Sequence, residues 1–164
     1  MSGVEHIFVY QHLLLPTDGS ELSERAAGDC VRLAKSLRAK ITALHTTALY
    51  YPPVLPAHTA SAHAGREYAV LAREYEEQSK ENAARALKPI ERMAHDASVV
   101  FGAVHLVSDS PWQVIINVAA ERGCDLIFMA SHGRRGVSAL LIGSETNKVL
   151  THTKIPVLVW RSTS

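Results

Sequence analysis

Five short apolar runs alternate with longer stretches of helical periodicity, and this alternation restricts the fold more than any other feature. The apolar runs are Ile7–Leu15, Lys40–Leu49, Val99–Val107, Asp125–Ala130 and Ile155–Trp160. Each run is short and bounded by turn-forming or charged residues, as buried strands are. The order β-α-β-α-β-α-β-α-β predicts an α/β fold with a parallel sheet, because right-handed crossovers place helices on both of its faces.

Four helices are expected between these strands. They are Glu21–Leu37 with Ser20 as N-cap, Arg66–His95, Pro111–Arg122 with Asp109 or Ser110 as cap, and a helix from Ser144 to about Thr151 with Ser144 as cap. Pro89 lies inside the second helix and is expected to kink or interrupt it, because proline cannot donate the helical hydrogen bond.

The segment Tyr50–Gly65 holds three prolines and no periodicity, which predicts a surface loop or lid. Its His58 and His63 have no carboxylate or cysteine at ligand spacing, so a solvated loop is favoured over a metal site.

Length and composition predict one domain over residues 1–164 and exclude several classes of protein. The chain is 47% hydrophobic and 20% charged, which is typical of a globular protein. Its 17 Lys and Arg nearly balance 16 Asp and Glu, which argues against nucleic-acid or membrane-surface binding. Cys30 and Cys124 lack C-x-x-C spacing and are expected to be buried thiols, consistent with the cytoplasm. We expect neither a signal peptide nor a membrane span.

Two polar loops that follow predicted strands, Pro16–Ser20 and Ser131–Gly136, suggest a ligand site together with a later helix start. Ser131–Gly136 carries two arginines, and Gly143-Ser144-Glu145-Thr146 has the pattern of a helix start. Free N–H groups at a helix N-terminus favour phosphate. The segment lacks the lysine of a P-loop and the G-x-G-x-x-G fingerprint, so a simple turn and helix cap remains the plainer alternative. Pro16–Ser20 follows the first strand, and both loops line one cleft if the two strands are neighbours at a switch point.

The chain resembles the universal stress protein family over nearly its whole length. The resemblance is carried by Pro16-Thr17-Asp18-Gly19-Ser20, Leu44-His45, Met129–Gly136, Gly143-Ser144 and Ile155–Val159, five segments in the family's order. It implies a Rossmann-like, three-layer α/β/α fold with strand order 3-2-1-4-5. It also implies a homodimer through the C-terminal strand Ile155–Trp160.

The resemblance further implies that ATP, alone or with Mg²⁺, binds as cofactor. Asp18 and its neighbours would face adenine and ribose, the backbone of Thr46 the adenine edge, and the later loops the phosphates. For Glu145 we expect the backbone, not the carboxylate, to face the ligand. The implied binding residues are Pro16, Thr17, Asp18, Thr46, Met129, Ala130, Ser131, His132, Gly133, Arg134, Arg135, Gly136, Gly143, Ser144, Glu145 and Thr146.

Two positions depart from the family pattern. The ATP-binding motif G-x-x-G-x9-G-[S/T] has Ala130 in place of its first glycine. Alanine is tolerated in a regular strand but crowds the ligand if the backbone needs a positive φ. Asp109 stands where the family commonly has glycine, and we expect it to cap the helix or to point away from phosphate.

Several residues also have a plainer interpretation. Asp18 can form an Asx-turn, and His132 can be a loop residue satisfied by backbone. At most one of Arg134 and Arg135 is expected to reach phosphate, and His45 suits a hydrogen-bonded position near the core.

Three functions remain open from the sequence. The preferred one is a cytoplasmic regulatory protein that binds ATP between the loops after the first and fourth strands. The second is a slow ATP hydrolase, for which His132 and Asp18 are the only candidate catalytic residues. The third is a dimeric interaction protein that has lost nucleotide binding through Ala130 and Asp109.

Overall fold

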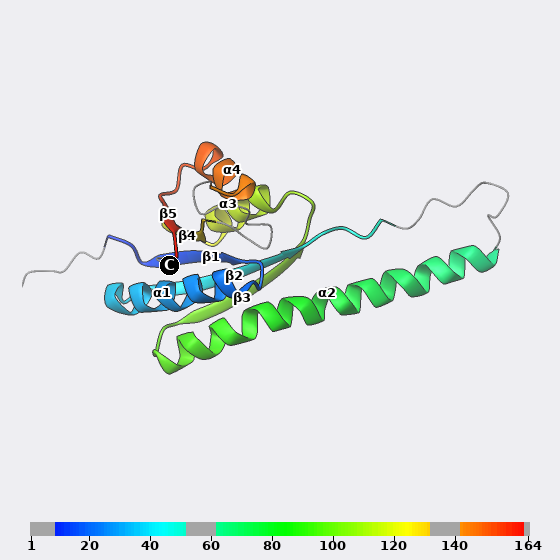
Figure 1. Cartoon of the computed structure of the whole chain (residues 1–164), viewed down its shortest axis with the longest axis horizontal. Coiled ribbons are helices and arrows are strands. Elements are labelled where there is room, and N and C mark those ends of the chain that lie inside the picture. The colour runs from blue at the N-terminus through cyan, green and yellow to red at the C-terminus, as the bar shows by residue number, and fades with distance from the viewer. Residues whose placement is uncertain (1–8, 52–61, 132–141, 163–164) are drawn as a thin grey trace, which may run out of the picture.

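The computed structural model describes residues 9–51, 62–131 and 142–162 (Figure 1). In chain order the elements are β1 (His12–Thr17), α1 (Glu21–Leu37), β2 (Lys40–Thr47), α2 (Ala62–Asp96), β3 (Phe101–Val107), α3 (Pro111–Glu121), β4 (Leu126–Ala130), α4 (Ser144–His152) and β5 (Val157–Trp160). Strands and helices alternate throughout, as the sequence predicts.

The strands form one parallel sheet in the order β3-β2-β1-β4-β5. The predicted α/β fold and strand order are therefore confirmed. The chain turns back at β1, so that β2 and β3 lie on one side of it and β4 and β5 on the other. The switch point between β1 and β4 is where α/β sheets of this kind bind ligands, at the carboxyl ends of the strands.

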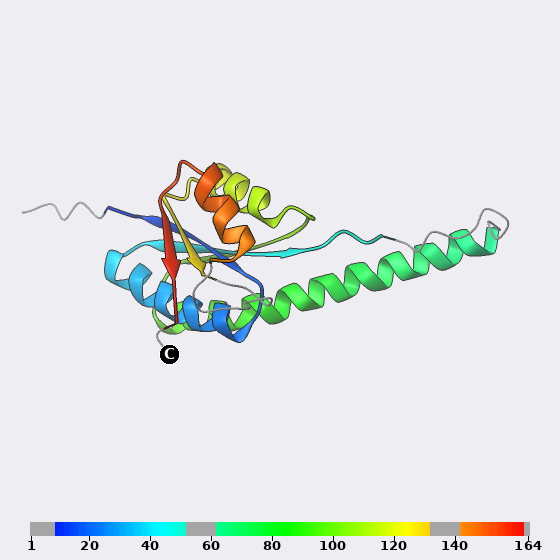
Figure 2. The same ribbon diagram turned by 45° about the horizontal axis from the view of Figure 1, so that its top comes forward.

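Helices cover both faces of the sheet, α1 and α2 on one and α3 and α4 on the other (Figures 1 and 2). Side chains of β1 alternate between the two layers: Leu13 and Leu15 pack with α1 and α2, whereas Leu14 packs with α3. All three leucines are at most 1% exposed. A strand buried on both faces explains why Leu13-Leu14-Leu15 is continuously apolar.

Each strand is shorter than the apolar run that predicted it. β1 begins at His12, which pairs with Lys40. The expected strand began at Ile7; its residues 9–11 are not part of the strand, and residues 7 and 8 lie outside the described part. It runs on to Thr17 because Pro16 and Thr17 remain in register with β2. β2 ends at Thr47, β3 begins at Phe101, β4 at Leu126 and β5 at Val157.

The helix α1 has the predicted bounds, and Ser20 is its N-cap, with its hydroxyl accepting from the Ser23 N–H. The helix α2 differs from its prediction at two places. It begins at Ala62, so Ala62–Gly65 belongs to the helix and not to the expected loop, whose residues 52–61, His58 included, lie outside the described part.

Pro89 does not interrupt α2, so the expected interruption was wrong, whereas the alternative of a kink stays a prediction. Its neighbours Ala86, Leu87 and Ile90 are all buried, Leu87 and Ile90 in the core shared with α1 and the sheet. This packing holds the helix together across the lost hydrogen bond. The buried part of α2 starts at Ser79, and the first half of the helix extends beyond the sheet (Figure 2).

Both cysteines are buried and free, as predicted. Burial raises the pKa of Cys30, and it raises that of Cys124 to about 11, so neither sulfur is a reactive thiolate at neutral pH. Among the helices in the described ranges, none is long and apolar enough to cross a bilayer.

His12 makes the stability of this fold depend on pH. Its Nε2 lies 2.8 Å from Thr42 Oγ1, and its Nδ1 is buried with no hydrogen-bond partner among the residues that the structure describes. Burial, then the positive charge of Lys40, lowers the pKa of His12 below its ordinary 6.5. The unfolded chain therefore binds more protons than the folded one as pH falls below 6.5, and the folded state loses stability there.

We predict that the free energy of unfolding, measured in urea, rises between pH 5 and pH 7 and that His12→Gln reduces this rise. His105, whose pKa burial also lowers, contributes in the same direction. The control is His95→Gln, because the His95 side chain is 88% exposed. An unchanged pH slope in His12→Gln would contradict the assignment.

Candidate functional site

A cavity of about 740 Å³ lies at the carboxyl ends of β1, β2 and β4. This volume is within the range of small-molecule sites. Its lining residues are Pro16, Thr17, Asp18, Ser23, Leu44, His45, Thr46, Thr47, Ala48, Tyr75, Asn82, Ser108, Asp109, Pro111, Ile115, Met129, Ala130, Gly143, Ser144, Glu145 and Thr146. The cavity is therefore at the predicted switch point, between the loop after β1 and the start of α4.

The β1–α1 loop forms one wall through local hydrogen bonds. Asp18 Oδ1 accepts from the Ser20 N–H at 3.0 Å, and Thr17 Oγ1 accepts from the Gly19 N–H at 3.2 Å. The first of these bonds is the Asx-turn that the sequence allowed for Asp18. Gly19 has a φ of 73°, a conformation that side-chain-bearing residues seldom adopt. The turn directs the loop back into α1 and leaves Asp18 at the cavity.

The end of β2 supplies the next wall. His45 is 3% exposed, and its Nδ1 lies 2.9 Å from Thr17 O, so this histidine joins β2 to the end of β1. It has the hydrogen-bonded, near-core position expected from the sequence. Thr47 Oγ1 lies 2.6 Å from Ser79 Oγ of α2 and 3.0 Å from His105 Nε2 of β3. These bonds fix the residues that flank Thr46.

Ala130 is the last residue of β4 and pairs with Trp160 of β5. Among the described residues, the non-glycine positions with positive φ are Arg38 and Ser98, so Ala130 has ordinary strand backbone. Its methyl group therefore introduces no backbone strain. The O atom of Ala130 accepts from Thr146 Oγ1 at 3.2 Å, which ties the end of β4 to the first turn of α4.

The helix α4 begins at Ser144, and Gly143 occupies its N-cap position. The expectation that Ser144 is the cap was wrong by one residue. The reason is that Gly143 N–H donates to Ser131 O at 2.8 Å and Gly143 O accepts from Asn147 N–H at 2.9 Å, which starts the helix one residue earlier. Ser144, Glu145 and Thr146 then form the first turn, whose N–H groups have no acceptor within the helix.

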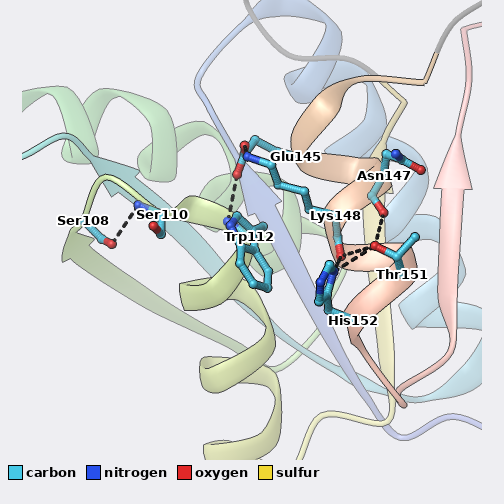
Figure 3. Close-up of polar contacts among 8 residues, drawn as sticks. All are labelled: Ser108, Ser110, Trp112, Glu145, Asn147, Lys148, Thr151 and His152. Atoms are coloured by element: carbon cyan, nitrogen blue, oxygen red, sulfur yellow. Dashed lines mark hydrogen bonds and ion pairs between the residues drawn. The ribbon is translucent and has the colours of Figure 1, made fainter.

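The carboxylate of Glu145 is directed at α3 (Figure 3). Its Oε2 accepts from the Trp112 N–H at 2.9 Å, and its Oε1 pairs with Lys148 Nζ at 2.9 Å. Both oxygens are thus engaged by groups of the protein, and the expectation that the backbone of Glu145 faces the ligand stays a prediction.

Asp109 is not the N-cap residue of α3, which is Ser110, and both of its carboxylate oxygens accept hydrogen bonds from the segment after β2. Its Oδ1 accepts from the Leu49 N–H at 2.9 Å, and its Oδ2 accepts from the Tyr51 hydroxyl. The hydrogen bond from Tyr51, then that from Leu49, lowers the pKa of Asp109 below its ordinary value. Asp109 therefore holds the segment that follows β2 against the β3–α3 loop. The same segment is also bound by Tyr75, whose hydroxyl donates to Ala48 O at 2.9 Å.

The structure brings together ten of the sixteen predicted binding residues around the cavity. They are Pro16, Thr17, Asp18, Thr46, Met129, Ala130, Gly143, Ser144, Glu145 and Thr146. Ser131 is not among the lining residues; it is 3% exposed, and its N–H donates to Trp160 O. His132, Gly133, Arg134, Arg135 and Gly136 lie outside the described residues.

Several lining residues were not predicted. Tyr75 and Asn82 come from α2, whose periodicity indicates a helix but not which end of the sheet its polar residues reach. Ser108 comes from the β3–α3 loop and Pro111 is the first residue of α3, a segment that was interpreted only as a helix start. The single available signal was its position at the end of a strand, the edge where the other loops meet.

We predict that Asp109→Ala speeds hydrogen exchange of the Leu49 amide severalfold, because this N–H loses its acceptor. The control is Asp96→Ala, an exposed aspartate at the end of α2. Hydrogen exchange read by NMR or mass spectrometry separates the two variants, and equal exchange of Leu49 in both would contradict the role of Asp109.

Comparisons with known proteins give one consistent family. The family model described as the universal stress protein family matches residues 9–161. A universal stress protein of Methanocaldococcus jannaschii is 29% identical over 151 residues, which cover 92% of this chain and 82% of that protein. The solved structure of a second M. jannaschii protein has a TM-score of 0.73 at 23% identity, covering 95% of this chain and 99% of the other.

Two further solved structures were determined with nucleotides. A universal stress protein in complex with cAMP has a TM-score of 0.57 at 21% identity, covering 93% of this chain and 98% of that chain. One from Archaeoglobus fulgidus in complex with dAMP has a TM-score of 0.56 at 16% identity, covering 92% and 98%. These likenesses show the shared fold. Since the family model spans nearly the whole chain, this protein belongs to the universal stress protein family.

Proposed function

We propose that this protein is a regulatory stress-response protein that binds an adenine nucleotide, ATP included, in the cavity between β1 and β4. The observation that carries the proposal is the cavity itself, which joins the ends of β1 and β2 to the N-terminus of α4. A helix N-terminus offers N–H donors and a favourable dipole to phosphate, and the strand ends offer backbone groups to a base.

The proposed pose follows the chemistry of the walls. Adenine and ribose lie against Pro16, Thr17 and Asp18, with the backbone of Thr46 at the adenine edge. Phosphates lie at Gly143, Ser144 and Thr146, where hydroxyl and N–H groups meet. We assign to His132, Gly133, Arg134, Arg135 and Gly136 the remaining contacts with ribose and phosphate, since arginine forks match phosphate oxygens.

The charged side chains of the described cavity wall are all acidic, which is why backbone N–H groups are important for the proposed phosphate binding. The charged lining residues in the described part are Asp18, Asp109 and Glu145. Each already accepts a hydrogen bond from a backbone N–H, of Ser20, Leu49 and Trp112 respectively. A phosphate here must be stabilised mainly by donors other than these side chains, or with the help of Mg²⁺.

The two departures from the family motif do not argue against binding. Ala130 has ordinary strand backbone, and both Asp109 oxygens are held by Leu49 and Tyr51. The relatives in complex with cAMP and dAMP support an adenine nucleotide as the ligand class. We therefore favour nucleotide binding over a scaffold that has lost its ligand, within one nucleotide-binding domain over residues 1–164 that acts in the cytoplasm.

We further propose a homodimer through the C-terminal strand. β5 is an edge strand of the sheet, and its Leu158 is 36% exposed. An exposed apolar edge strand presents unpaired backbone groups that a second copy can pair with.

We predict that Ser144→Asp weakens the binding of AMP and ATP at least tenfold in calorimetric titrations, performed with and without Mg²⁺. The new carboxylate lies beside the proposed phosphate, where like charges repel, yet it favours the helix N-terminus and should not lower the melting temperature. The control is Asn147→Asp, which adds the same charge to an exposed position of the same helix outside the cavity.

Saturable binding that survives Asn147→Asp and is lost in Ser144→Asp supports the proposed site. Equal affinities of the two variants would contradict the proposed position of the phosphate at the start of α4. An absence of binding by the unaltered protein would leave the dimeric scaffold as the better description.

We predict that Leu158→Lys shifts the protein from dimer to monomer in light scattering after size exclusion, because a charge at the paired edge is not tolerated there. Leu150→Lys in α4 is the matched control, since Leu150 is 38% exposed but lies outside β5. A monomeric unaltered protein, or equal masses for both variants, would refute this interface.

A further inference from the structure

The N-terminus of α3 has one backbone donor that its own residues do not satisfy. Pro111 at the first position has no N–H, and Gln113 and Val114 donate to Ser110 O at 3.1 and 3.2 Å. Ser110 occupies the N-cap position, but its side chain makes no capping hydrogen bond. The N–H of Trp112 therefore needs an acceptor from elsewhere in the protein.

Glu145 supplies that acceptor from the first turn of α4. Its Oε2 lies 2.9 Å from Trp112 N, across 33 positions of the sequence. A carboxylate at a helix N-terminus is favoured by the helix dipole as well as by the hydrogen bond. Glu145 thus does for α3 what an N-cap side chain ordinarily does, but from another helix.

Trp112 reinforces the connection at the other end of α4. Its ring lies 4.7 Å, between centroids, from the ring of His152 in the last turn of that helix (Figure 3). Trp112 accordingly contacts α4 at its first turn through the main chain and at its last turn through the side chain. These two contacts restrict rotation of α4 relative to α3.

Both joined helix starts border the cavity. Ser108, Asp109 and Pro111 line it on the α3 side, and Gly143 and Ser144 line it on the α4 side. A change in the direction of the first turn of α4 would move the N–H groups of Ser144 and Thr146 relative to anything bound there. The Glu145–Trp112 contact is the described hydrogen bond that joins the two starts directly.

We infer that Glu145 is a positioning residue that sets the affinity of the cavity for the phosphate of its nucleotide by capping α3 from α4. This inference rests on the proposed function. Glu145 acts through its hydrogen bond to Trp112 and does not need to contact the ligand. Because adenine and ribose lie against β1 and β2 in the proposed pose, adenosine without a phosphate is insensitive to Glu145.

Three variants separate positioning from charge. Glu145→Ala removes the acceptor, and Glu145→Gln keeps an amide oxygen for the Trp112 N–H while it removes the negative charge. Lys148→Ala is the matched control, because it removes the other partner of Glu145 and leaves the bond to Trp112. Glu145→Leu serves as a second acceptor-free variant if Glu145→Ala does not fold.

The test compares AMP and adenosine affinities of all variants by calorimetry, well below their melting temperatures, together with hydrogen exchange of the Trp112 amide without ligand. We expect Glu145→Ala to weaken AMP binding about fivefold or more, to leave adenosine within about twofold, and to speed Trp112 exchange. Glu145→Gln should restore AMP affinity to at least the unaltered level, and Lys148→Ala should keep Trp112 protected.

The outcomes distinguish this inference from the proposed function. If the unaltered protein binds AMP but Glu145→Ala binds it equally well, the positioning role is refuted and the proposed function stands. The positioning role is also refuted if AMP and adenosine weaken by equal factors, as simple destabilisation would cause. If the unaltered protein binds neither, the proposed function and the inference both fail.

Discussion

The reversal of strand order beside β1 is the constraint on which the rest of this structure depends. Leu13, Leu14 and Leu15 are buried on both faces of the sheet, so β1 must be central, with β2 and β4 as its neighbours. The crossovers after β1 and β4 then leave on opposite faces, and their loops separate above the strand ends. The cavity is the space between them, and it follows from burying one apolar strand.

Phosphate recognition in such a cavity depends on main-chain groups and on the direction of one short helix. α4 has nine residues, and three hydrogen bonds hold its start: Gly143 to Ser131, Thr146 to Ala130, and Glu145 to Trp112. The carboxylates of the described wall are held by N–H groups of the protein. This arrangement keeps negative side chains near the site without directing them into it, and it links the site to α3 and to the segment after β2.

The sequence predicts most of the fold because its signals are local and strong. Apolar runs, the Ser20 cap and Pro111 at a helix start locate elements to within a few residues. The failures arise where tertiary packing decides: α2 continues across Pro89 because buried neighbours hold it, and α4 is capped at Gly143 because Ser131 accepts its N–H. The hydrogen bonds of Tyr75, Glu145 and Asp109 around the cavity join positions 27, 33 and 60 residues apart and leave no local pattern.

The central claim is the location of the nucleotide, and amide chemical shifts of ¹⁵N-labelled protein titrated with AMP test it most directly. We expect saturable shifts concentrated at Gly19, Thr46, Gly143 and Ser144, which come from two strand ends and one helix start around the cavity. Amide shifts of residues at the amino ends of the strands, such as Lys40 and Val99, should stay unchanged. Shifts concentrated at the amino ends, or no shifts at saturating AMP and ATP, would contradict this location.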